Sequence, residues 1–299
     1  MVTNTVRIQW VREVTACCHQ LSANAMLLMV VKYHTMVEIE VLRNIDSARE
    51  ITDVIKSAWG SVSLDQDIKD IFLAANFNGG ISLVAREDGK IKGINFGFPG
   101  YRSGKLYLYS HLTGIANDVK GSGIGYALKI AQKNWAVENG YDLITWTFDP
   151  LMRVNASLNI GKIGAISRNY HFNFYGKLDD SLNFGLNTDR ILSEWWLNIP
   201  KLPVPVPHVI YNVAKVPDHF VLDYNEKNIG VEIPADFLNL KKLDMESAGQ
   251  IQKTTGKIIS SLFTNGYIIC GFLKKNNMYV LTRNNSMKSN YGPNVFSQT

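Results

Sequence analysis

Two turn signals close together in the sequence restrict how the central part of the chain can fold. The runs ISLVARE and IKGINFGF alternate apolar and polar residues, and DGK joins them with the strong hairpin dipeptide Asp88-Gly89. The segment PGYRSGK has the composition of a loop, and a third run, LYLYSHLTGI, follows it. Strands joined in this way pair antiparallel. A sheet of parallel strands that alternate with helices is therefore not expected.

Helical patterns flank these strands. VEIEVLRNI, from residue 37, alternates as a strand does, and DSAREITDVIKSAWG then repeats apolar residues at helical spacing. After the third run, Ile124 to Trp135 form one apolar stripe, and Lys129, Gln132 and Lys133 are predicted to lie outside it. Asn139-Gly140 predicts the end of this helix. LITWTF, which follows, is typical of a strand buried on both faces.

The second half of the chain contains a proline-rich break. NASLNIGKIG predicts a short helix weakened by glycine, and AISRNYHFNFYG and DRILSEWWLNI predict two strands. PKLPVPVP holds four of the nine prolines and is predicted to be a linker. A long amphipathic helix and a terminal hairpin are expected after it. We therefore predict a mostly antiparallel, mixed α/β (α+β) fold with these parts: an N-terminal extension at 1–36 outside the fold proper, a main domain at 37–199, a linker at 200–208, and a smaller helix-plus-hairpin region at 209–299.

Charge and cysteine content exclude several classes of protein. The net charge is +5 without a block of lysines and arginines, so nucleic-acid binding is not expected. The three cysteines, two of them adjacent, form neither a disulfide framework nor a CxxC zinc motif, and the histidines have no metal-ligand spacing. We therefore expect no metal and a reducing, cytoplasmic location. AMLLMVVKY is too short to span a bilayer, and no clean signal-peptide cleavage site follows it.

The stretch KGSGIGY, between the third run and the helix after it, is a candidate phosphate-binding turn. Three glycines allow successive backbone N–H groups to converge on an anion, while the helix N-terminus and Lys120 add positive charge. The stretch lacks the Lys-Ser/Thr of a P-loop, and Tyr126 occupies the place of the third glycine of a dinucleotide fingerprint. A tight strand-to-helix turn without a ligand is the alternative.

Residues 120–125 resemble the Q/R-x-x-G-x-G/A pyrophosphate loop of the GNAT superfamily of N-acetyltransferases. The order of strands and helices over residues 37–199 is similar to the GNAT arrangement. The runs TWTFDPLMRVNASLNIGKIGA, RNYHFNFYG and LNTDRILSEWWL look like a little-studied branch of GNAT proteins with an added C-terminal region. The resemblance implies that acetyl-CoA is the acyl donor. It implies these donor-binding residues: Thr113, Gly114, Ile115, Lys120, Gly121, Ser122, Gly123, Ile124, Gly125, Tyr126 and Asn155.

His111 is the expected general base. It lies on the strand that corresponds to the central GNAT strand, and a period of two places it on one face with Tyr109 and Thr113. An ordinary histidine pKa near 6.5 suits proton transfer at neutral pH. The alternative is a histidine that packs among tyrosines without a catalytic role.

The acid that protonates the departing thiolate is harder to place. Ile160 stands where many GNAT proteins have a tyrosine, so Tyr175, beside Gly176, is the candidate, with Tyr170 as another choice. A core tyrosine is the alternative reading. Several polar residues could line an acceptor site: Asp149, Asn155, Asn159, Asn173, Asp189 and Arg190.

The resemblance and these residues together predict an acetyl-CoA-dependent N-acyltransferase in which an amine attacks the donor directly within a ternary complex. No cysteine lies near the loop, the central strand or the signature, which disfavours an acyl-enzyme. The expected partners are acetyl-CoA and an amine acceptor, small molecule or protein, without nucleic acid or membrane, and a homodimer is one allowed assembly. The alternative is a non-catalytic acyl-CoA-binding or regulatory module on the same fold.

Overall fold

The computed structural model describes these residues: 8–22, 25–42, 48–60, 68–178, 180, 182–217, 219–283, 285 and 289–297. Up to residue 36 only the backbone is described. The chain divides into two compact units. The first unit comprises Met1–Phe98 and Ser110–Glu138, and the second comprises Pro99–Tyr109 and Asn139–Thr299. The strand β5 (Lys105–Ile115) therefore begins in the second unit and ends in the first.

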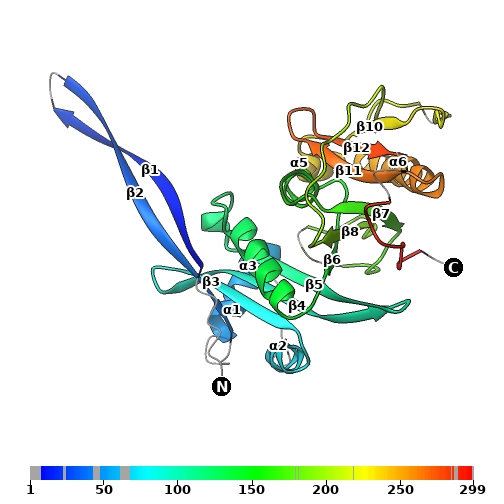
Figure 1. Ribbon diagram of the computed structural model, residues 1–299. Coiled ribbons are helices and arrows are strands. Elements are labelled where there is room, and N and C mark those ends of the chain that lie inside the picture. Colours follow the sequence, from blue (N-terminus) through cyan, green and yellow to red (C-terminus); the bar gives the residue numbers. More distant parts are fainter. Residues whose placement is uncertain are drawn as a thin grey trace. The chain divides into compact units, whose positions relative to one another are not determined.

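The sheet of the first unit is built from neighbouring antiparallel strands. β1 (Ile8–Ser22) and β2 (Ala25–Val41) form a long ribbon, β2 pairs with β3 (Ile81–Glu87), and β3 pairs with β4 (Lys90–Arg102) (Figure 1). The hairpin predicted at Asp88-Gly89 is confirmed, and both residues have positive φ angles, of 50° and 75°. The predicted strand at the start of the main domain is confirmed within β2.

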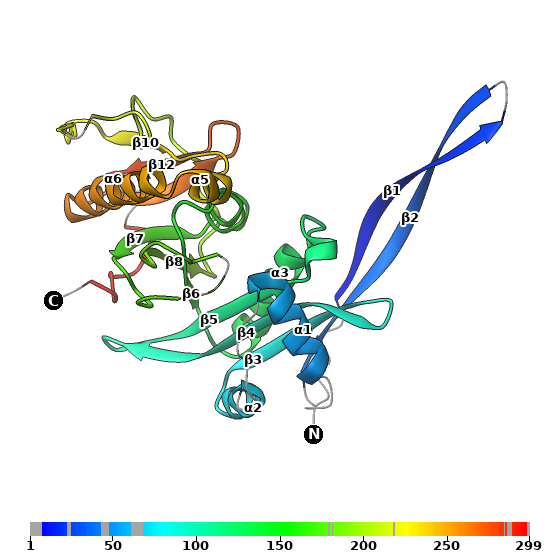
Figure 2. The same cartoon turned by 180° about the vertical axis from the view of Figure 1, so that it is seen from behind.

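Helices cover both faces of this sheet. α1 (Ala48–Trp59) and α3 (Ile124–Glu138) lie on opposite faces (Figures 1 and 2). Apolar side chains of α1 pack with Phe72 of α2 (Ile68–Phe77) and with Ile94 and Phe96 of β4. The helices α1 and α3 confirm the predicted ones, whereas α2 was not predicted, because apolar residues occur around its whole circumference and obscure the helical period.

A glycine allows α3 to approach the sheet closely. A Cβ atom at Gly93 of β4 would lie 2.9 Å from Ile124 and 3.0 Å from Leu128, both on α3. The side of α3 that faces the strands also carries polar residues, since Lys129 is 3 % exposed and Gln132 is fully buried. The prediction that these two side chains lie outside the buried stripe is therefore wrong.

The β4–β5 connection is tighter than the composition of PGYRSGK suggested. β4 continues to Arg102 and β5 begins at Lys105, so only Ser103 and Gly104 lie between the strands. Both have positive φ angles, of 48° and 78°, which suits the right-handed twist of a two-residue hairpin. The predicted loop is therefore mostly strand.

The second unit contains a mixed sheet. Its order is β5, β6 (Leu143–Phe148), β8 (Arg190–Trp196), β7 (Ile166–His171), β11 (Ile268–Leu273), β12 (Met278–Thr282), β10 (Asn228–Glu232) and β9 (Val209–Asn212). The β5–β6 and β9–β10 pairs are parallel and the others are antiparallel. The predicted terminal hairpin is confirmed as β11–β12. A mixed, mostly antiparallel sheet flanked by helices is thus confirmed.

Helical segments accompany this sheet in the described part of the chain. α4 (Arg153–Ala156) continues as the π-helix η3 (Ser157–Ile163), which ends at Gly164 with φ 84°. α5 (Phe237–Leu243) precedes α6 (Met245–Thr264), the predicted long amphipathic helix. The carboxylate of Asp244 accepts a hydrogen bond from the Ser247 N–H at 2.9 Å and so caps α6.

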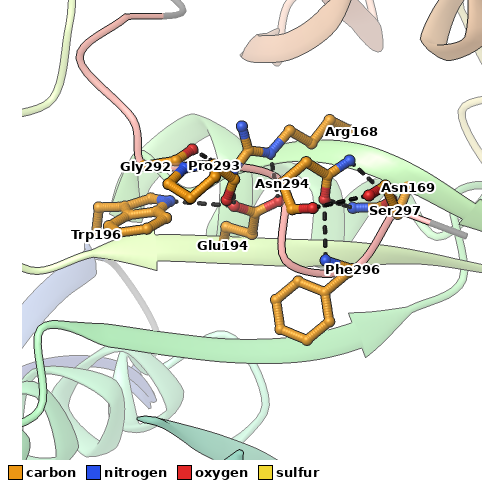
Figure 3. A network of polar contacts seen from close by, with 9 residues as sticks. All are labelled: Arg168, Asn169, Glu194, Trp196, Gly292, Pro293, Asn294, Phe296 and Ser297. Atoms are coloured by element: carbon orange, nitrogen blue, oxygen red, sulfur yellow. Dashed lines mark hydrogen bonds and ion pairs between the residues drawn. The ribbon is translucent and has the colours of Figure 1, made fainter. Parts of the chain in front are cut away.

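A partly buried polar network holds a distant segment on β7 and β8 (Figure 3). Arg168 makes two bonds to the carboxylate of Glu194, at 2.8 and 2.7 Å, and donates to the carbonyl oxygens of Gly292 and Pro293. Asn169 and Asn294 exchange amide hydrogen bonds of 2.9 and 3.1 Å. Beyond this network, Val295 and Phe296 pack with Leu143 and Leu192, and the segment 292–297 thus completes this part of the core.

The predicted boundaries differ from those of the compact units. β11 pairs with β7 at Ile269 and Ser167, so the region after residue 209 and the strands before residue 199 share one sheet. Residues 201–207 have no helix or strand, as a linker would. The domain boundaries stay a prediction, and so does the independence of residues 1–36, which limited proteolysis would test.

Candidate functional site

The glycine loop lies between β5 and α3 in the first unit. The φ angles of Gly121 and Gly123 are +80° and +94°, in the left-handed region that glycine adopts without strain. The 3₁₀ helix η2 (Asn117–Val119) precedes the loop, and Ser122 Oγ accepts a hydrogen bond of 3.4 Å from the Ile124 N–H, where α3 begins. The loop therefore turns directly into the helix.

This turn has the features of an anion site. The first N–H groups of an α-helix lack carbonyl partners within the helix, and the dipole places partial positive charge there. Lys120 is exposed, and Tyr126 is half-buried in the first turn of α3. A Cβ at Gly125 would make an ordinary contact of 3.6 Å with Ile115, so alanine fits at 125, whereas a side chain at 121 or 123 would strain the backbone.

His111 lies against two aromatic rings of β4. Its ring centroid is 6.2 Å from that of Phe96 and 5.8 Å from that of Phe98. The residue keeps access to solvent, while partial burial of the ring lowers the pKa of the imidazole below its ordinary value. The lowered pKa favours the neutral imidazole, the form that can accept a proton.

The alternation of side chains along β5 fails between His111 and Thr113. The Asn95 amide donates to Thr113 Oγ1 at 2.8 Å and to Ser110 Oγ at 3.4 Å. A regular strand would place Ser110 and Thr113 on opposite faces, because they are an odd number of residues apart. The strand is irregular here. The prediction that His111 and Thr113 share a face is wrong, because His111 meets Phe96, which neighbours Asn95 and points the other way.

Tyr175 belongs to a cluster of hydroxyl groups in the second unit. Its phenol oxygen lies 3.1 Å from Thr147 Oγ1 on β6 and 3.4 Å from the hydroxyl of Tyr109 on β5. The Tyr109 and Thr147 hydroxyls are 3.4 Å apart. Burial, with Tyr175 adding to it, raises the pKa of Tyr109. All three groups are thus in reach of one another and can exchange a proton through hydrogen bonds.

The backbone that carries Tyr175 is fixed by β8 and the residues before it. Tyr175 is in a turn after β7, because the strand ends at His171, earlier than predicted. The Tyr175 N–H donates to Thr188 Oγ1 at 2.9 Å, and the Asn173 N–H donates to Asp189 Oδ1 at 2.9 Å. The guanidinium of Arg190 lies 5.4 Å from the centre of the Tyr175 ring. The hydroxyl therefore extends from a well-held turn.

Asn155 and Ile160 lie on the helical segment after β6. Asn155 is exposed on α4, while Ile160 is fully buried in η3. The position where a tyrosine acid was expected is therefore part of the core. Gly161 stands beside the carbonyl of Phe272, 3.3 Å from where its Cβ would be, which explains a glycine in this helix.

The predicted site residues fall into two groups. His111, the segment 113–115 and the loop 120–126 belong to the first unit, and Tyr175 and Asn155 belong to the second. Within each unit the residues are placed as described.

The hydroxyl partners of Tyr175 were missed at the sequence level. Thr147 was visible only as the next-to-last residue of a buried strand, where a polar side chain is uncommon.

Of the polar residues predicted to line an acceptor site, several bond to one another. Asp189 accepts from the Tyr170 hydroxyl at 2.8 Å, and Arg190 donates to the carbonyl oxygen of Asp189 at 2.8 Å. Asp149 accepts from the Leu151 N–H at 2.8 Å, and burial raises its pKa despite that bond and nearby cations. The contacts of Asp189 and Arg190 support the turn around Tyr175. The part of these residues in acceptor binding stays a prediction.

The described part of the chain contains no group of three or more histidine, cysteine, aspartate or glutamate side chains placed to hold a metal. Within that same part, no helix is long and apolar enough to cross a membrane.

No family model matches the chain, and no curated protein matches it either. Solved structures do. The protein yncA from Salmonella typhimurium, with its cofactor acetyl-CoA, is 15 % identical, covers 56 % of this chain and 97 % of its own, and has a TM-score of 0.46. A GNAT-family acetyltransferase from Streptococcus pneumoniae is 18 % identical over 53 % of this chain and 97 % of its own, with a TM-score of 0.44.

A third structure, of a GNAT-family acetyltransferase from Elizabethkingia anophelis with acetyl-CoA bound, is 16 % identical over 54 % of this chain and 97 % of its own, with a TM-score of 0.40. These values are too low to transfer an activity from the solved proteins. The chain is similar to GNAT-family structures over 53–56 % of its length.

Proposed function

We propose that the chain is an acetyl-CoA-dependent N-acyltransferase in which an acceptor amine attacks the thioester directly. One observation carries the proposal: Gly121 and Gly123 have left-handed backbone conformations in the turn that follows β5 and precedes α3. Such a turn exposes backbone N–H groups to a pyrophosphate. The lysine before the glycines and the GNAT-like sequence over residues 120–125 support acetyl-CoA among the possible anions.

The residues have separate tasks in this proposal. The loop 120–126 and Asn155 hold the CoA part of the donor, and the backbone of 113–115 binds the pantetheine arm and the thioester carbonyl. His111, whose surroundings lower its pKa, accepts the proton of the amine as the nitrogen bonds to the acetyl carbon. The thioester C–S bond then breaks, and the Tyr175 hydroxyl protonates the departing thiolate. The reaction takes place in a reducing, cytoplasmic compartment.

Isothermal titration with acetyl-CoA, with NADH and ATP as controls, tests the proposal. Selective binding of acetyl-CoA, lost when Gly123 is replaced by valine, is the expected result. Failure of the wild-type protein to bind would overturn the proposal. If the donor binds, amines of different classes are screened for the release of free CoA thiol.

A second candidate is a non-catalytic acyl-CoA-binding module. The fully buried Ile160 favours it, because this position offers no acid to the thiolate. Thr147, Tyr109 and Tyr175 favour catalysis, since they provide hydroxyl groups in a cluster. Two results together would select the second candidate. The wild-type protein binds acetyl-CoA but releases no free thiol with any amine, and Tyr175→Phe gives the same binding and the same absence of thiol release.

A further inference from the structure

We propose that Asn95 is a positioning residue for the acyl donor: it fixes the irregular end of β5 through Thr113. The inference rests on the proposed function, because the segment 113–115 is where the thioester would bind. Asn95 does not itself touch the donor in this proposal. It determines the position of the backbone that does.

The contacts around Asn95 form a closed, buried cluster in the first unit. The Asn95 side chain is fully buried, and its amide donates to Thr113 Oγ1 at 2.8 Å and to Ser110 Oγ at 3.4 Å. From the other side, the Lys129 amine of α3 donates to Ser110 Oγ at 2.8 Å. One amide on β4 thus fixes two hydroxyls of β5, and α3 fixes the first of them again.

These contacts hold a departure from regular strand geometry. Ser110 and Thr113 both face Asn95, although three positions separate them. The next residue, Gly114, faces the opposite side, because a Cβ there would lie 2.6 Å from the ring of Trp59 on α1. The strand must therefore accommodate an extra residue between Ser110 and Thr113, as in a β-bulge, which redirects the backbone that follows.

The cluster is a poor choice for stability alone. Asn95 Oδ1 is buried and has no hydrogen-bond partner among the described residues, and the Lys129 amine is taken out of water. A buried polar atom without a partner, such as Asn95 Oδ1, and a buried amine each cost free energy that an apolar cluster of the same shape would not. A requirement to hold Thr113 in place explains why polar groups occupy these positions.

The test is a double-mutant cycle on acetyl-CoA affinity in the full chain. Thr113→Val removes the hydroxyl at constant shape, Thr113→Ser keeps it, and Asn95→Leu removes the donor. We expect Thr113→Val and Asn95→Leu each to weaken binding about five- to tenfold, the effect of losing one buried hydrogen bond. The acetyl-CoA affinity of the double variant should be no lower than that of the single variant with the lower affinity. The affinity of Thr113→Ser should stay within about twofold of that of the wild type.

Thr255→Val provides a matched control. This threonine of α6 is fully buried, whereas Thr113 is half-buried, and it donates to the Ile251 carbonyl at 2.7 Å, far along the chain from the loop. It should change the melting temperature without changing the affinity. If Asn95→Leu does not fold, the comparison of Thr113→Val with Thr113→Ser decides alone.

The outcomes separate the two proposals. A wild-type protein that does not bind acetyl-CoA overturns the proposed function, and this inference with it. A wild-type protein that binds, combined with unchanged affinity in Thr113→Val or with additive losses in the double variant, overturns only the role of Asn95. If Thr113→Ser loses as much acetyl-CoA affinity as Thr113→Val does, this result also overturns only the role of Asn95.

Discussion

The amine of Lys129 donates a 2.8 Å hydrogen bond to the hydroxyl of Ser110, and only 3 % of the lysine is exposed to solvent. Burial lowers the pKa of this amine from 10.5 to about 7. The folded protein therefore binds a proton at this site less readily than the unfolded chain does. The protonated amine therefore costs more stability than the neutral amine does.

The free energy of unfolding should accordingly rise with pH across the interval from about 7 to 10.5, because the unfolded chain there holds a proton that the folded chain has released. The slope from one such group approaches about 1.4 kcal/mol per pH unit. Lys129→Met should remove this contribution and stabilise the protein most below pH 7. Urea unfolding at several pH values measures it. Lys90→Met, at an exposed residue, is the control. If the free energy of unfolding has the same dependence on pH in both variants, the lowered pKa of Lys129 is contradicted.

His111→Ala should lower the turnover rate by about 10²–10⁴-fold while the dissociation constant of acetyl-CoA stays nearly unchanged, because a general base acts on the acceptor and not on the donor. The imidazole pKa is lowered by burial, so wild-type activity should fall with acidification only below the ordinary histidine range. The pH–rate profile of thiol release measures this. A profile unaltered by the substitution would contradict the assigned role.

Gly121→Ala should weaken acetyl-CoA binding beyond what its effect on folding explains. Gly121 has φ +80° with open space around its missing side chain, and Gly140 has the same φ in equally open space. Alanine at either position should therefore destabilise by about 1–2 kcal/mol through backbone strain. Titration calorimetry should find weaker binding for Gly121→Ala alone. Equal affinities of the two variants would show that the loop does not contact the donor.

Glu194→Gln should destabilise the second unit by about 1.5–3 kcal/mol, because it removes the counter-charge of the largely buried Arg168 guanidinium, which keeps its bonds to the carbonyl oxygens of Gly292 and Pro293. The Glu194 side chain is not exposed, and that of Arg168 is 13 % exposed. Asp118→Asn breaks the ion pair with Lys92, in which the carboxylate is 59 % exposed, and should cost less than about 1 kcal/mol. Chemical unfolding measures both, and similar losses would contradict a buried, tightly held pair.

The elements predicted with strong local signals are those that the structure confirms. The Asp88-Gly89 hairpin has a turn dipeptide between alternating runs, the helix from Ile124 has an apolar stripe, and LITWTF is a nearly continuous apolar sequence. Each signal is contained within about fifteen residues, so local physics decides the outcome. The position of the glycine loop, between a strand and a helix, followed from the same signals.

Contacts between residues that are distant in the sequence could not be predicted from such local signals. The irregularity of β5 depends on Asn95, on another strand, and no turn residue marks it. Lys129 looked like a solvated residue because the polar partner that accepts its hydrogen bond, Ser110, lies 19 positions away. The hydroxyl cluster joins Tyr109 and Tyr175, 66 residues apart, and only the folded sheet brings them together.

The segment at 292–297 has a consequence for synthesis on the ribosome. Arg168 bonds to a carbonyl 124 residues further along the chain, so the surface around Leu143 and Leu192 stays uncovered until that segment has been made. At roughly 5–20 residues per second this takes about 6–25 s. During that time the nascent second unit exposes an apolar surface to chaperones and to neighbouring nascent chains, whereas the residues of the first unit have all been synthesised by Glu138.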